Sequence, residues 1–402
     1  MTDESDKSGC LAGLRVLDLS RILAGPTCTQ ILGDLGADVI KVEKPNDGDD
    51  TRKWGPPFVA GVDGMPTAES AYYLCANRNK RSVALDIGTD EGKRAIHALI
   101  SRSDILVENF KAGGLARYGL DYATLSQRFP GLIYCSITGF GQNGPYSARP
   151  GYDHVAQAMG GIMSLTGDSD GPPMKVGVGI ADVTTGLYAT IGILAALRHR
   201  DRTGVGQHID CSLLDTQVSW LINEATNYFL SGEEPRRKGN SHPNICPYNV
   251  YRTQDGHVVL AVGNDAQFQR WTEIARTPDL ARDPRFATNA GRLGNRVALE
   301  PIVAEAMRSR LTSFWIDALE RAGVPCGPVN TIEQVFADPH VLARQMKISM
   351  AYEGARGGRI DLLGSPLKLS ETPVSYRRPP PRLGEHSSEV LAEVTHRTSD
   401  PA

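Results

Sequence analysis

The chain has 402 residues and a formal net charge of −3, from 43 basic and 46 acidic residues. A balance this close to neutrality gives no support to nucleic-acid binding or to attraction to a membrane surface. Hydrophobic residues make up 41% of the chain, as is typical of a globular protein long enough to fold without disulfides or structural metals.

Seven cysteines are scattered along the sequence, and none forms a C-x-x-C pair. This usage indicates free thiols in a reducing cytosol and argues against a disulfide framework or a zinc site. The polar, acidic N-terminus is unlike a signal peptide, and the longest apolar run, around residues 186–197, is shorter than a membrane-spanning helix needs to be. We therefore expect a cytoplasmic protein that binds neither a membrane nor a metal.

Strands and helices alternate through the first part of the chain. The run LRVLDLS (14–20) has the alternating pattern of a strand, and Gly25-Pro26 then opens a helix that Gly36 closes. The run ADVIKVE (37–43) predicts the next strand. A strand, a helix and a second strand in this order form the repeating unit of a parallel sheet.

The same alternation continues along the first half of the chain. Three further strands and two helices are predicted, in chain order at 81–86, 90–101, 104–110, 122–128 and 132–141. The pattern predicts an α/β, doubly wound domain. Its first strand–helix turn lacks the G-x-G-x-x-G motif, and the proline in that turn removes a backbone donor that a pyrophosphate would need, so NAD is a disfavoured ligand.

The second half of the chain has a different pattern. A long apolar helix is predicted at 183–199, and another at 213–230 leads into the polar stretch SGEEPRRKGNSHPN, which marks a domain boundary. Beyond it, YNVYRTQDGHVVLAVG predicts a hairpin that turns on Asp255-Gly256, and GVPCGPVN (323–330) predicts a linker. The later proline run, RRPPPRLGEH, is expected to lie along the surface or to bind a partner as an extended helix.

Basic residues cluster at or near predicted strand ends, in ADVIKVEKP, NRNKRS and ENFKAGGLARYGL. Open α/β sheets bind ligands at the carboxyl ends of their strands, so such a cluster could hold a polyanion such as a phosphorylated nucleotide carrier. A solvated charged surface is the alternative that spacing alone leaves open. The residues concerned include Lys44, Lys80, Arg81, Asn109 and Arg117.

The stretch GVGIADVTTG (177–186) places an acid, Asp182, in a small, glycine-spaced run before an apolar helix. Aspartate is a favoured N-cap residue, so Asp182 is a candidate to cap its own helix. A carboxylate can also act as a covalent nucleophile, and free N–H groups at a helix start can stabilise an oxyanion. The two roles are partly compatible, and spacing alone favours the cap.

Several long motifs, in the right order, resemble the class III coenzyme A transferase family, which includes formyl-CoA transferase, carnitine CoA-transferase and α-methylacyl-CoA racemase. They include RILAGPTCTQILGDLGADVIKVEKP, NRNKRSVALD, LVENFKAGGLARYGLDY, GVGIADVTTGLYATIGILAAL and GVPCGPVNTIEQVFADP. The resemblance implies an interlocked-ring homodimer. It also implies a Rossmann-like parallel-sheet large domain built from both chain ends (1–222 and 325–402) and a smaller α+β domain at 223–324.

In this family the aspartate that matches Asp182 is the nucleophile. The resemblance implies that Asp182 attacks an acyl-CoA thioester to form a mixed anhydride, that an aspartyl-CoA thioester follows, and that a carboxylic acid leaves as the new thioester. Coenzyme A, carried by the acyl-CoA substrate, is the cofactor implied, with no metal and no NAD. The residues that match the family's CoA contacts are Leu23, Ala24, Lys44, Lys80, Arg81, Asn109, Arg117, Tyr152 and Asp153.

Two positions favour a transferase over the racemases of the family. Tyr152 replaces a racemase histidine, and a phenol is a poor general base near neutrality. A racemase glutamate is missing from the region 264–266. The overall pattern resembles members that use succinyl-CoA or glutaryl-CoA with dicarboxylic acids, and the candidates to hold a distal carboxylate are Arg149, Arg252 and His242.

Two other hypotheses stay open at this level. One is an epimerase, racemase or dehydratase of the same family that acts on an acyl-CoA. The other is a non-enzymatic CoA-binding protein in which Asp182 only caps its helix.

Overall fold

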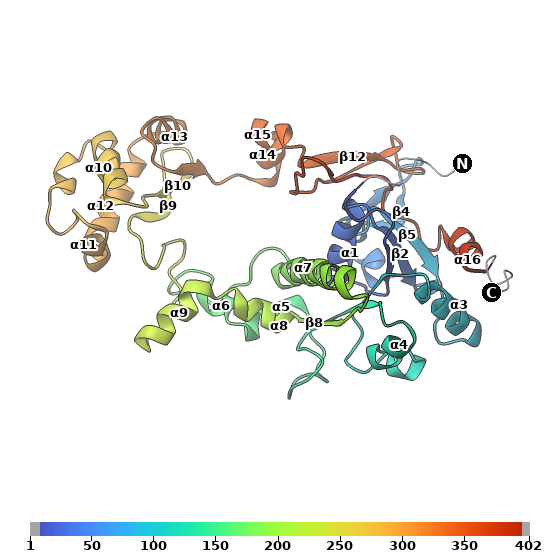
Figure 1. Ribbon diagram of the computed structural model, residues 1–402. Coiled ribbons are helices and arrows are strands. Elements are labelled where there is room, and N and C mark those ends of the chain that lie inside the picture. The colour runs from blue at the N-terminus through green and yellow to red at the C-terminus, as the bar shows by residue number, and fades with distance from the viewer. Residues whose placement is uncertain (1–8, 396–402) are drawn as a thin grey trace. The chain divides into compact units, whose positions relative to one another are not determined.

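The computed structural model describes residues 9–395, and the chain divides into two compact units (Figure 1). The large unit comprises Met1–Ile162, Lys175–Asn223 and Pro339–Ala402, so it is assembled from segments near both ends of the sequence. The small unit comprises Met163–Met174 and Glu224–Asp338. These boundaries differ from the predicted ones, because the small unit continues past residue 324 to Asp338 and also includes 163–174.

A six-stranded parallel sheet forms the centre of the large unit, in the spatial order β5-β2-β1-β6-β7-β8. Its strands are β1 (Arg15–Asp18), β2 (Asp38–Glu43), β5 (Lys80–Ala84), β6 (Ile105–Glu108), β7 (Ile133–Thr138) and β8 (His208–Ser212). Renumbered by chain order, these strands run 3-2-1-4-5-6, which is the order of a doubly wound, Rossmann-like sheet. The predicted α/β parallel sheet is confirmed, and its strand order reverses between β1 and β6.

One face of the sheet is covered by α1 (Ala24–Asp34) and α7 (Ile180–Thr203), which pack against each other (Figure 1). Their buried side chains form one hydrophobic core with alternate residues of the strands. Gly186 makes the close approach possible, because a Cβ at that position would lie 2.7 Å from the carbonyl oxygen of Ala24. The start of α7 is thereby held next to the start of α1.

The opposite face of the sheet is covered by α3 (Asp90–Ile100), α4 (Tyr122–Arg128) and α16 (Ser387–Thr395). Buried residues of all three helices join those of the strands in a second core. Because α16 packs against α3 and β5, the C-terminal segment completes the large unit.

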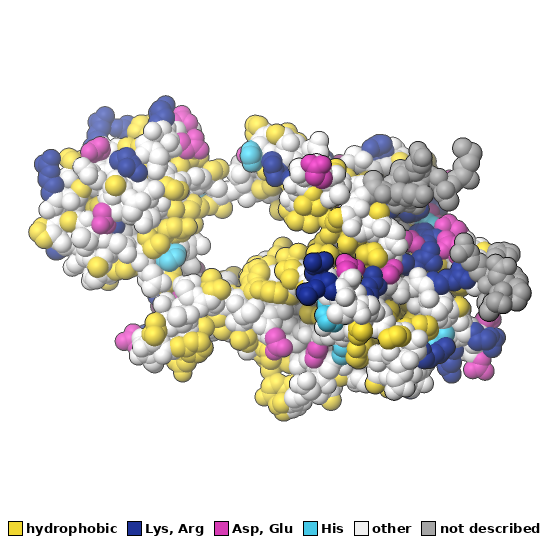
Figure 2. Space-filling model, in the orientation of Figure 1, with side chains coloured by type: hydrophobic (Ala, Val, Ile, Leu, Met, Phe, Trp, Pro, Cys, Tyr) yellow, Lys and Arg dark blue, Asp and Glu magenta, His cyan; other side chains and the backbone are white. Residues whose placement is uncertain are grey.

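By length and composition alone, α7 could cross a membrane, since it has 24 residues and a strongly apolar window. Half of that window, 50%, is buried within the protein, as in the core helix of a globular domain. Its other face carries exposed Leu187, Tyr188 and Ile191, and Figure 2 shows hydrophobic side chains gathered over this helix. A single copy of the chain therefore leaves one apolar stripe of α7 uncovered.

The large unit also contains shorter elements. These are η2 (Asp50–Lys53), β3 (Phe58–Ala60), β4 (Pro66–Ser70), α2 (Ala71–Leu74), η3 (Ala116–Tyr118), α5 (Asp153–Met159), α8 (Leu213–Ser219), α15 (Pro339–Ala343), β12 (Lys347–Ala351) and β13 (Arg359–Leu363). Two further helices, α6 (Ile162–Leu165) and α9 (Ile222–Ser231), lie where the chain passes from one unit to the other.

Two predicted segments differ from the structure of this region. The single helix predicted at 213–230 is two helices, because Ile222 has a φ of 35°, which a continuous α-helix cannot contain. The proline run lies along the large unit, where the amide of Asn79 donates to the carbonyl of Arg378 and Arg52 Nη2 donates to the carbonyl of Pro381.

The small unit combines an antiparallel sheet, in the order β11-β10-β9, with helices. The elements are β9 (Tyr248–Arg252), β10 (His257–Ala261), α10 (Asp265–Ile274), η4 (Pro278–Ala281), α11 (Asn289–Gly294), α12 (Arg296–Arg308), α13 (Thr312–Arg321), β11 (Cys326–Pro328) and α14 (Ile332–Ala337). The hairpin predicted on Asp255-Gly256 is confirmed. The predicted linker at 323–330 instead contains β11, which pairs with β10 and keeps this segment in the small unit.

Candidate active site

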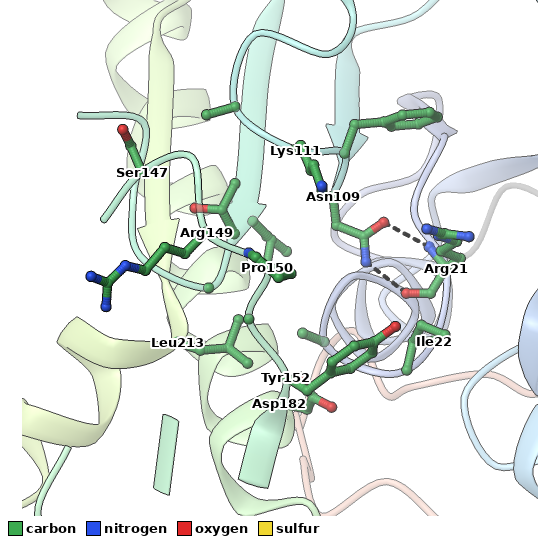
Figure 3. A pocket seen from close by; sticks show the side chains of 17 residues that line it. Arg21, Ile22, Asn109, Lys111, Ser147, Arg149, Pro150, Tyr152, Asp182 and Leu213 are labelled. Carbon is green, nitrogen blue, oxygen red and sulfur yellow. Dashed lines mark hydrogen bonds between the residues drawn. The ribbon is translucent and has the colours of Figure 1, made fainter. Parts of the chain in front are cut away.

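A cavity of about 170 Å³ lies at the carboxyl ends of β1, β6 and β7 (Figure 3). The loops after these strands line it, together with the first turn of α7. Its lining residues are Arg21, Ile22, Ala24, Asn109, Phe110, Lys111, Ala112, Ile137, Thr138, Gly139, Ser147, Arg149, Pro150, Gly151, Tyr152, Asp182 and Leu213. The cavity thus lies beside the point where the strand order reverses, which is where doubly wound folds bind ligands.

Asp182 lies in the first turn of α7, with 8% of its surface exposed. Within residues 9–395 no hydrogen bond reaches its carboxylate. Burial, and then the negative charge of Asp153, raise the pKa of Asp182 to about 7. A buried carboxylate without hydrogen bonds is a stronger base and a better nucleophile than one in water.

Asp182 is not the cap of its helix, contrary to the simpler interpretation of its sequence. The helix begins at Ile180, its N-cap is Gly179, and no side chain of the N-cap residue bonds to it. Asp153 supplies the cap instead, from α5: its Oδ1 accepts hydrogen bonds from the amides of Ala181 (2.8 Å) and Asp182 (3.4 Å). The second carboxylate in the site therefore has the structural role that was predicted for the first.

Asp153 is itself held by a buried glutamine. Gln157 Nε2 donates to Asp153 Oδ2 at 2.7 Å, and Gln157 Oε1 accepts the amide hydrogen of Val176 at 2.9 Å. Both oxygens of Asp153 are thus engaged, one by the helix and one by Gln157. This arrangement fixes a negative charge beside Asp182.

The N–H groups at the start of α7 are already paired. Ile180 donates to the carbonyl of Val178, Ala181 and Asp182 donate to Asp153, and Val183 donates to the carbonyl of Gly179. The sequence predicted that these donors could stabilise an oxyanion. In the structure they cannot do so unless Asp153 is displaced. The N–H groups of the helix start that carries the nucleophile are therefore not available to a substrate oxygen.

The start of α1 is different. Its N-cap residue, Leu23, makes no side-chain hydrogen bond to the helix, and Ala24 lines the cavity. In the described part of the chain, no hydrogen bond uses the N–H groups of Leu23, Ala24 or Gly25. Such unpaired donors carry the partial positive charge of a helix N-terminus. The donors available to a developing oxyanion therefore belong to α1.

The structure places the predicted site residues in four groups. Ala24, Asn109, Tyr152 and Asp182 line the cavity, and Tyr152 is 58% exposed. Asp153 lies directly behind Asp182, and Leu23 lies against the segment before α7, since a Cβ on Gly179 would be 3.2 Å from Leu23 Cδ2. Lys44 and Arg117 are exposed and do not line the cavity: Lys44 Nζ lies 3.3 Å from an Asp47 oxygen, and Arg117 stacks on Tyr118.

The fourth group, Lys80 and Arg81, lies inside the large unit, although the sequence predicted either ligand contacts or surface charge. Lys80 Nζ is fully buried and lies 3.1 Å from Asp18 Oδ2, and burial lowers the pKa of Lys80 to about 8. The Arg81 guanidinium pairs with Asp38 and with Glu389 and Glu393 of α16. Both charges are compensated within the protein, so contact with coenzyme A remains a prediction for these residues.

Sequence reasoning did not single out several residues of the site. Arg21 and Ile22 line the cavity, and Gln157 supports Asp153. Of these three residues, only Gln157 could have been found from the sequence, because a residue four places after Asp153 lies on the same face of a helix and can contact it. Among residues 9–395, no group of three or more His, Cys, Asp and Glu side chains is placed to hold a metal ion.

Comparison with known proteins gives a consistent result. Residues 11–387 match the model of CoA-transferase family III. The chain is 48% identical to the succinate–glutarate CoA-transferase of Agrobacterium fabrum, with 100% of both chains covered, and 44% identical to the succinyl-CoA:glutarate CoA-transferase of Homo sapiens, over 96% of this chain and 86% of that one. The crystal structure of a CaiB/BaiF family protein from Brucella suis superposes with a TM-score of 0.85 at 47% identity, and the match covers 96% of this chain and 100% of that one.

Proposed function

Because the chain belongs to CoA-transferase family III and is a CoA-transferase, we propose that it moves coenzyme A from a dicarboxylyl-CoA, such as succinyl-CoA or glutaryl-CoA, to a carboxylic acid, with Asp182 as the nucleophile. The observation that carries the proposal is the environment of Asp182, a buried carboxylate without hydrogen bonds in the wall of the cavity. The names of the two relatives support a dicarboxylate pair.

The first half-reaction starts from Asp182 as the carboxylate. One Oδ atom attacks the thioester carbonyl carbon, the C–S bond breaks, and coenzyme A leaves as the thiolate, so that a mixed anhydride joins Asp182 to the acyl group. The thiolate then attacks the aspartyl carbonyl carbon of the anhydride. This step forms an aspartyl-CoA thioester and releases the donor acid as its carboxylate.

The second half-reaction reverses this sequence with the acceptor. The acceptor carboxylate attacks the aspartyl thioester, the thiolate leaves, and a new anhydride forms. The thiolate then attacks the acceptor's carbonyl carbon, which releases the new acyl-CoA and restores the Asp182 carboxylate. Each step exchanges a carboxylate and a thiolate at a carbonyl carbon, so no proton has to be supplied, and the free N–H groups of α1 are suited to hold each transient oxyanion.

We assign the distal carboxylate of the substrate to Arg149. This residue lines the cavity, its guanidinium lies 3.8 Å over the ring of Tyr146, and no ion pair within residues 9–395 engages it. Figure 3 shows the guanidinium directed away from Asp182. In the proposed binding mode, the far end of an extended dicarboxylate lies against it. A charge-assisted contact there would favour dicarboxylates over monocarboxylates. The other two sequence candidates, Arg252 and His242, belong to the small unit.

Trapping of the covalent intermediate tests the proposed function. The enzyme is incubated with succinyl-CoA, treated with hydroxylamine and digested, and the peptides are analysed by mass spectrometry. A hydroxamate on Asp182 is expected, together with exchange of coenzyme A onto glutarate. Full exchange activity in Asp182→Asn would refute the mechanism, and deuterium uptake at the α-carbon without exchange would instead indicate an epimerase or racemase.

We also propose that the enzyme works as an interlocked-ring homodimer in the cytoplasm. Exposed Leu187, Tyr188 and Ile191 on α7 support a second copy of the chain, because large apolar stripes are seldom left in water. Light scattering should report about twice the chain mass of 43.4 kDa. Interlocked subunits should not exchange with a tagged copy unless they are first unfolded, and a monomer would contradict the proposal.

A further inference from the structure

Ile22, in the wall of the cavity, has a backbone conformation that its side chain disfavours. Its φ is 72°, in the left-handed region that glycine and asparagine occupy readily and β-branched residues avoid. Such a conformation persists only where surrounding contacts determine it, and it is found most often at functional sites. Contacts from outside the loop must therefore hold Ile22 in this conformation.

The Asn109 side chain holds the backbone just before Ile22. Its Oδ1 accepts the amide hydrogen of Arg21 at 3.0 Å, and its Nδ2 donates to the carbonyl oxygen of Arg21 at 2.7 Å (Figure 3). The two bonds imitate a pair of strand hydrogen bonds. They bridge the loops after β1 and β6, and so they span the point where the strand order reverses.

A buried ion pair holds the same loop from the other side. Lys41 Nζ lies 2.9 Å from Asp49 Oδ2, and both side chains are 0% exposed. The lysine donates to the carbonyl of Ser20 at 2.8 Å, and Asp49 Oδ1 accepts the amide hydrogen of Ile22 at 3.2 Å. Every peptide group from Ser20 to Ile22 is thus tied to a side chain from outside the loop.

The strained residue lies directly before the start of α1. Leu23 is the N-cap, and Ala24 lines the cavity together with Asp182. The direction in which α1 begins, and hence the position of its unpaired N–H groups, depends on the backbone angles of Ile22. A relaxed Ile22 would turn the chain and move these donors.

We propose that Asn109 is a positioning residue, which holds Ile22 in the left-handed conformation and thereby places the start of α1 opposite Asp182. This inference rests on the proposed function of the cavity. Both polar atoms of the Asn109 amide are already engaged with Arg21, so its principal role precedes substrate binding. This differs from the role implied by the family resemblance, in which Asn109 is only a contact for coenzyme A.

Hydrogen–deuterium exchange of the free enzyme separates the two roles. In Asn109→Ala the amides of Arg21 and Ile22 should exchange at least about tenfold faster than in the wild type, because one acceptor is lost and the loop is released. Asn143→Ala, an exposed asparagine outside the cavity lining, is the matched control and should change neither amide. If Asn109 were only a ligand contact, exchange in the free enzyme would be unchanged, and the inference would be overturned.

Kinetics and a second substitution complete the test. Asn109→Ala should lower kcat about 10- to 100-fold with little change in KM for the acyl-CoA, because the loop orients the reacting groups. Ile22→Gly in the same chain should restore much of kcat, since glycine occupies positive φ without strain. A raised KM with no rescue would overturn the inference. If Asn109→Ala does not fold, Asn109→Asp replaces it in the test, because aspartate keeps the oxygen that accepts the Arg21 amide hydrogen but loses the donor to the Arg21 carbonyl. Asn109→Asp should give a smaller loss of kcat, and Ile22→Gly should again reduce that loss.

The exchange measurement needs no activity, so it can fail while the proposed function holds. Conversely, a wild-type enzyme that forms no adduct on Asp182 would refute the proposed function and leave the loop contacts intact.

Discussion

The Asp153 carboxylate lies 2.8 Å from the amide nitrogen of Ala181 and so caps the helix that carries Asp182. The sequence made Asp182 the candidate both for the cap and for the nucleophile. In the structure these roles belong to two carboxylates that approach the same helix start from different elements. Asp153 and Asp182 can therefore be substituted separately, and the two substitutions should have different consequences.

The substitution Asp182→Asn should stabilise the fold near neutral pH while it abolishes transfer. Burial and Asp153 raise the pKa of Asp182 from 3.8 to about 7, so the folded state binds this proton more tightly than the unfolded state does. The wild type accordingly loses stability as the pH rises between these two values, and asparagine removes the loss. The free energy of unfolding of the variant should exceed that of the wild type by about 1–3 kcal/mol at about pH 8 and equal it at about pH 4.

Urea unfolding of both proteins at the two pH values checks this prediction. Asp90→Asn, at a carboxylate that is 91% exposed, should give no pH-dependent difference. An equal difference between Asp182→Asn and the wild type at both pH values would contradict it.

The pH dependence of catalysis should follow the same carboxylate. Because Asp182 must be ionised to attack, kcat/KM should fall as the pH drops through about 7. Asp153→Asn keeps an oxygen that can cap α7 but removes the negative charge beside Asp182, which lowers the pKa of Asp182. The acidic limb of the pH profile should then move down by roughly one pH unit. An unmoved limb would show that the charge of Asp153 does not act on the nucleophile.

Arg149→Ala should change which acids the enzyme accepts. Loss of the guanidinium should raise KM for glutarate about 10- to 100-fold, since a charge-assisted hydrogen bond contributes about 1.5–3 kcal/mol. KM for a monocarboxylate of similar length, such as butyrate, should change little. Arg202→Ala, at an exposed arginine near the end of α7, is the matched control. A parallel rise for both acids would show that Arg149 does not bind the distal carboxylate.

Substitutions at Lys80 and Lys44, two predicted contacts for coenzyme A, should give different results. Lys80→Met removes the cation that is paired with the buried Asp18 carboxylate and should reduce the free energy of unfolding by about 3–5 kcal/mol. Lys44→Ala removes an exposed side chain and should change stability by less than about 0.5 kcal/mol, so any rise in its KM for acyl-CoA reports a lost contact. A stable Lys80→Met protein with a raised KM would instead identify Lys80 as a ligand residue.

The sheet could be predicted from the sequence because its signals are local. Strand periodicity, the glycine and proline of the first turn, and the motif around Asp182 all lie within short windows, and they led to the parallel sheet and to Asp182 in the cavity wall. Ala24 and Tyr152, which also line the cavity, were implied only by the family resemblance. The capping interaction could not be predicted in this way, because Asp153 reaches Ala181 across 28 residues of sequence.

The other errors also have physical causes. Lys80 and Arg81 are charged, and composition places such residues at the surface unless their partners are known. Their partners come from β1, β2 and α16, which only the fold brings together. The break before Ile222 contains no glycine or proline, so nothing in the sequence indicated that the helix is interrupted there. The strand Cys326–Pro328 contains both residues, so it was predicted as a linker.

The position of α16 has a consequence for how the protein is made. Arg81, at the edge strand β5, pairs with Glu389 and Glu393 of this helix, which follows the small unit in the sequence and is therefore translated after it. During translation one apolar face of the parallel sheet therefore stays partly exposed while the whole small unit is synthesised. Nascent chains halted before residue 387 should recruit chaperones through that face, and synthesis of α16 should end the association.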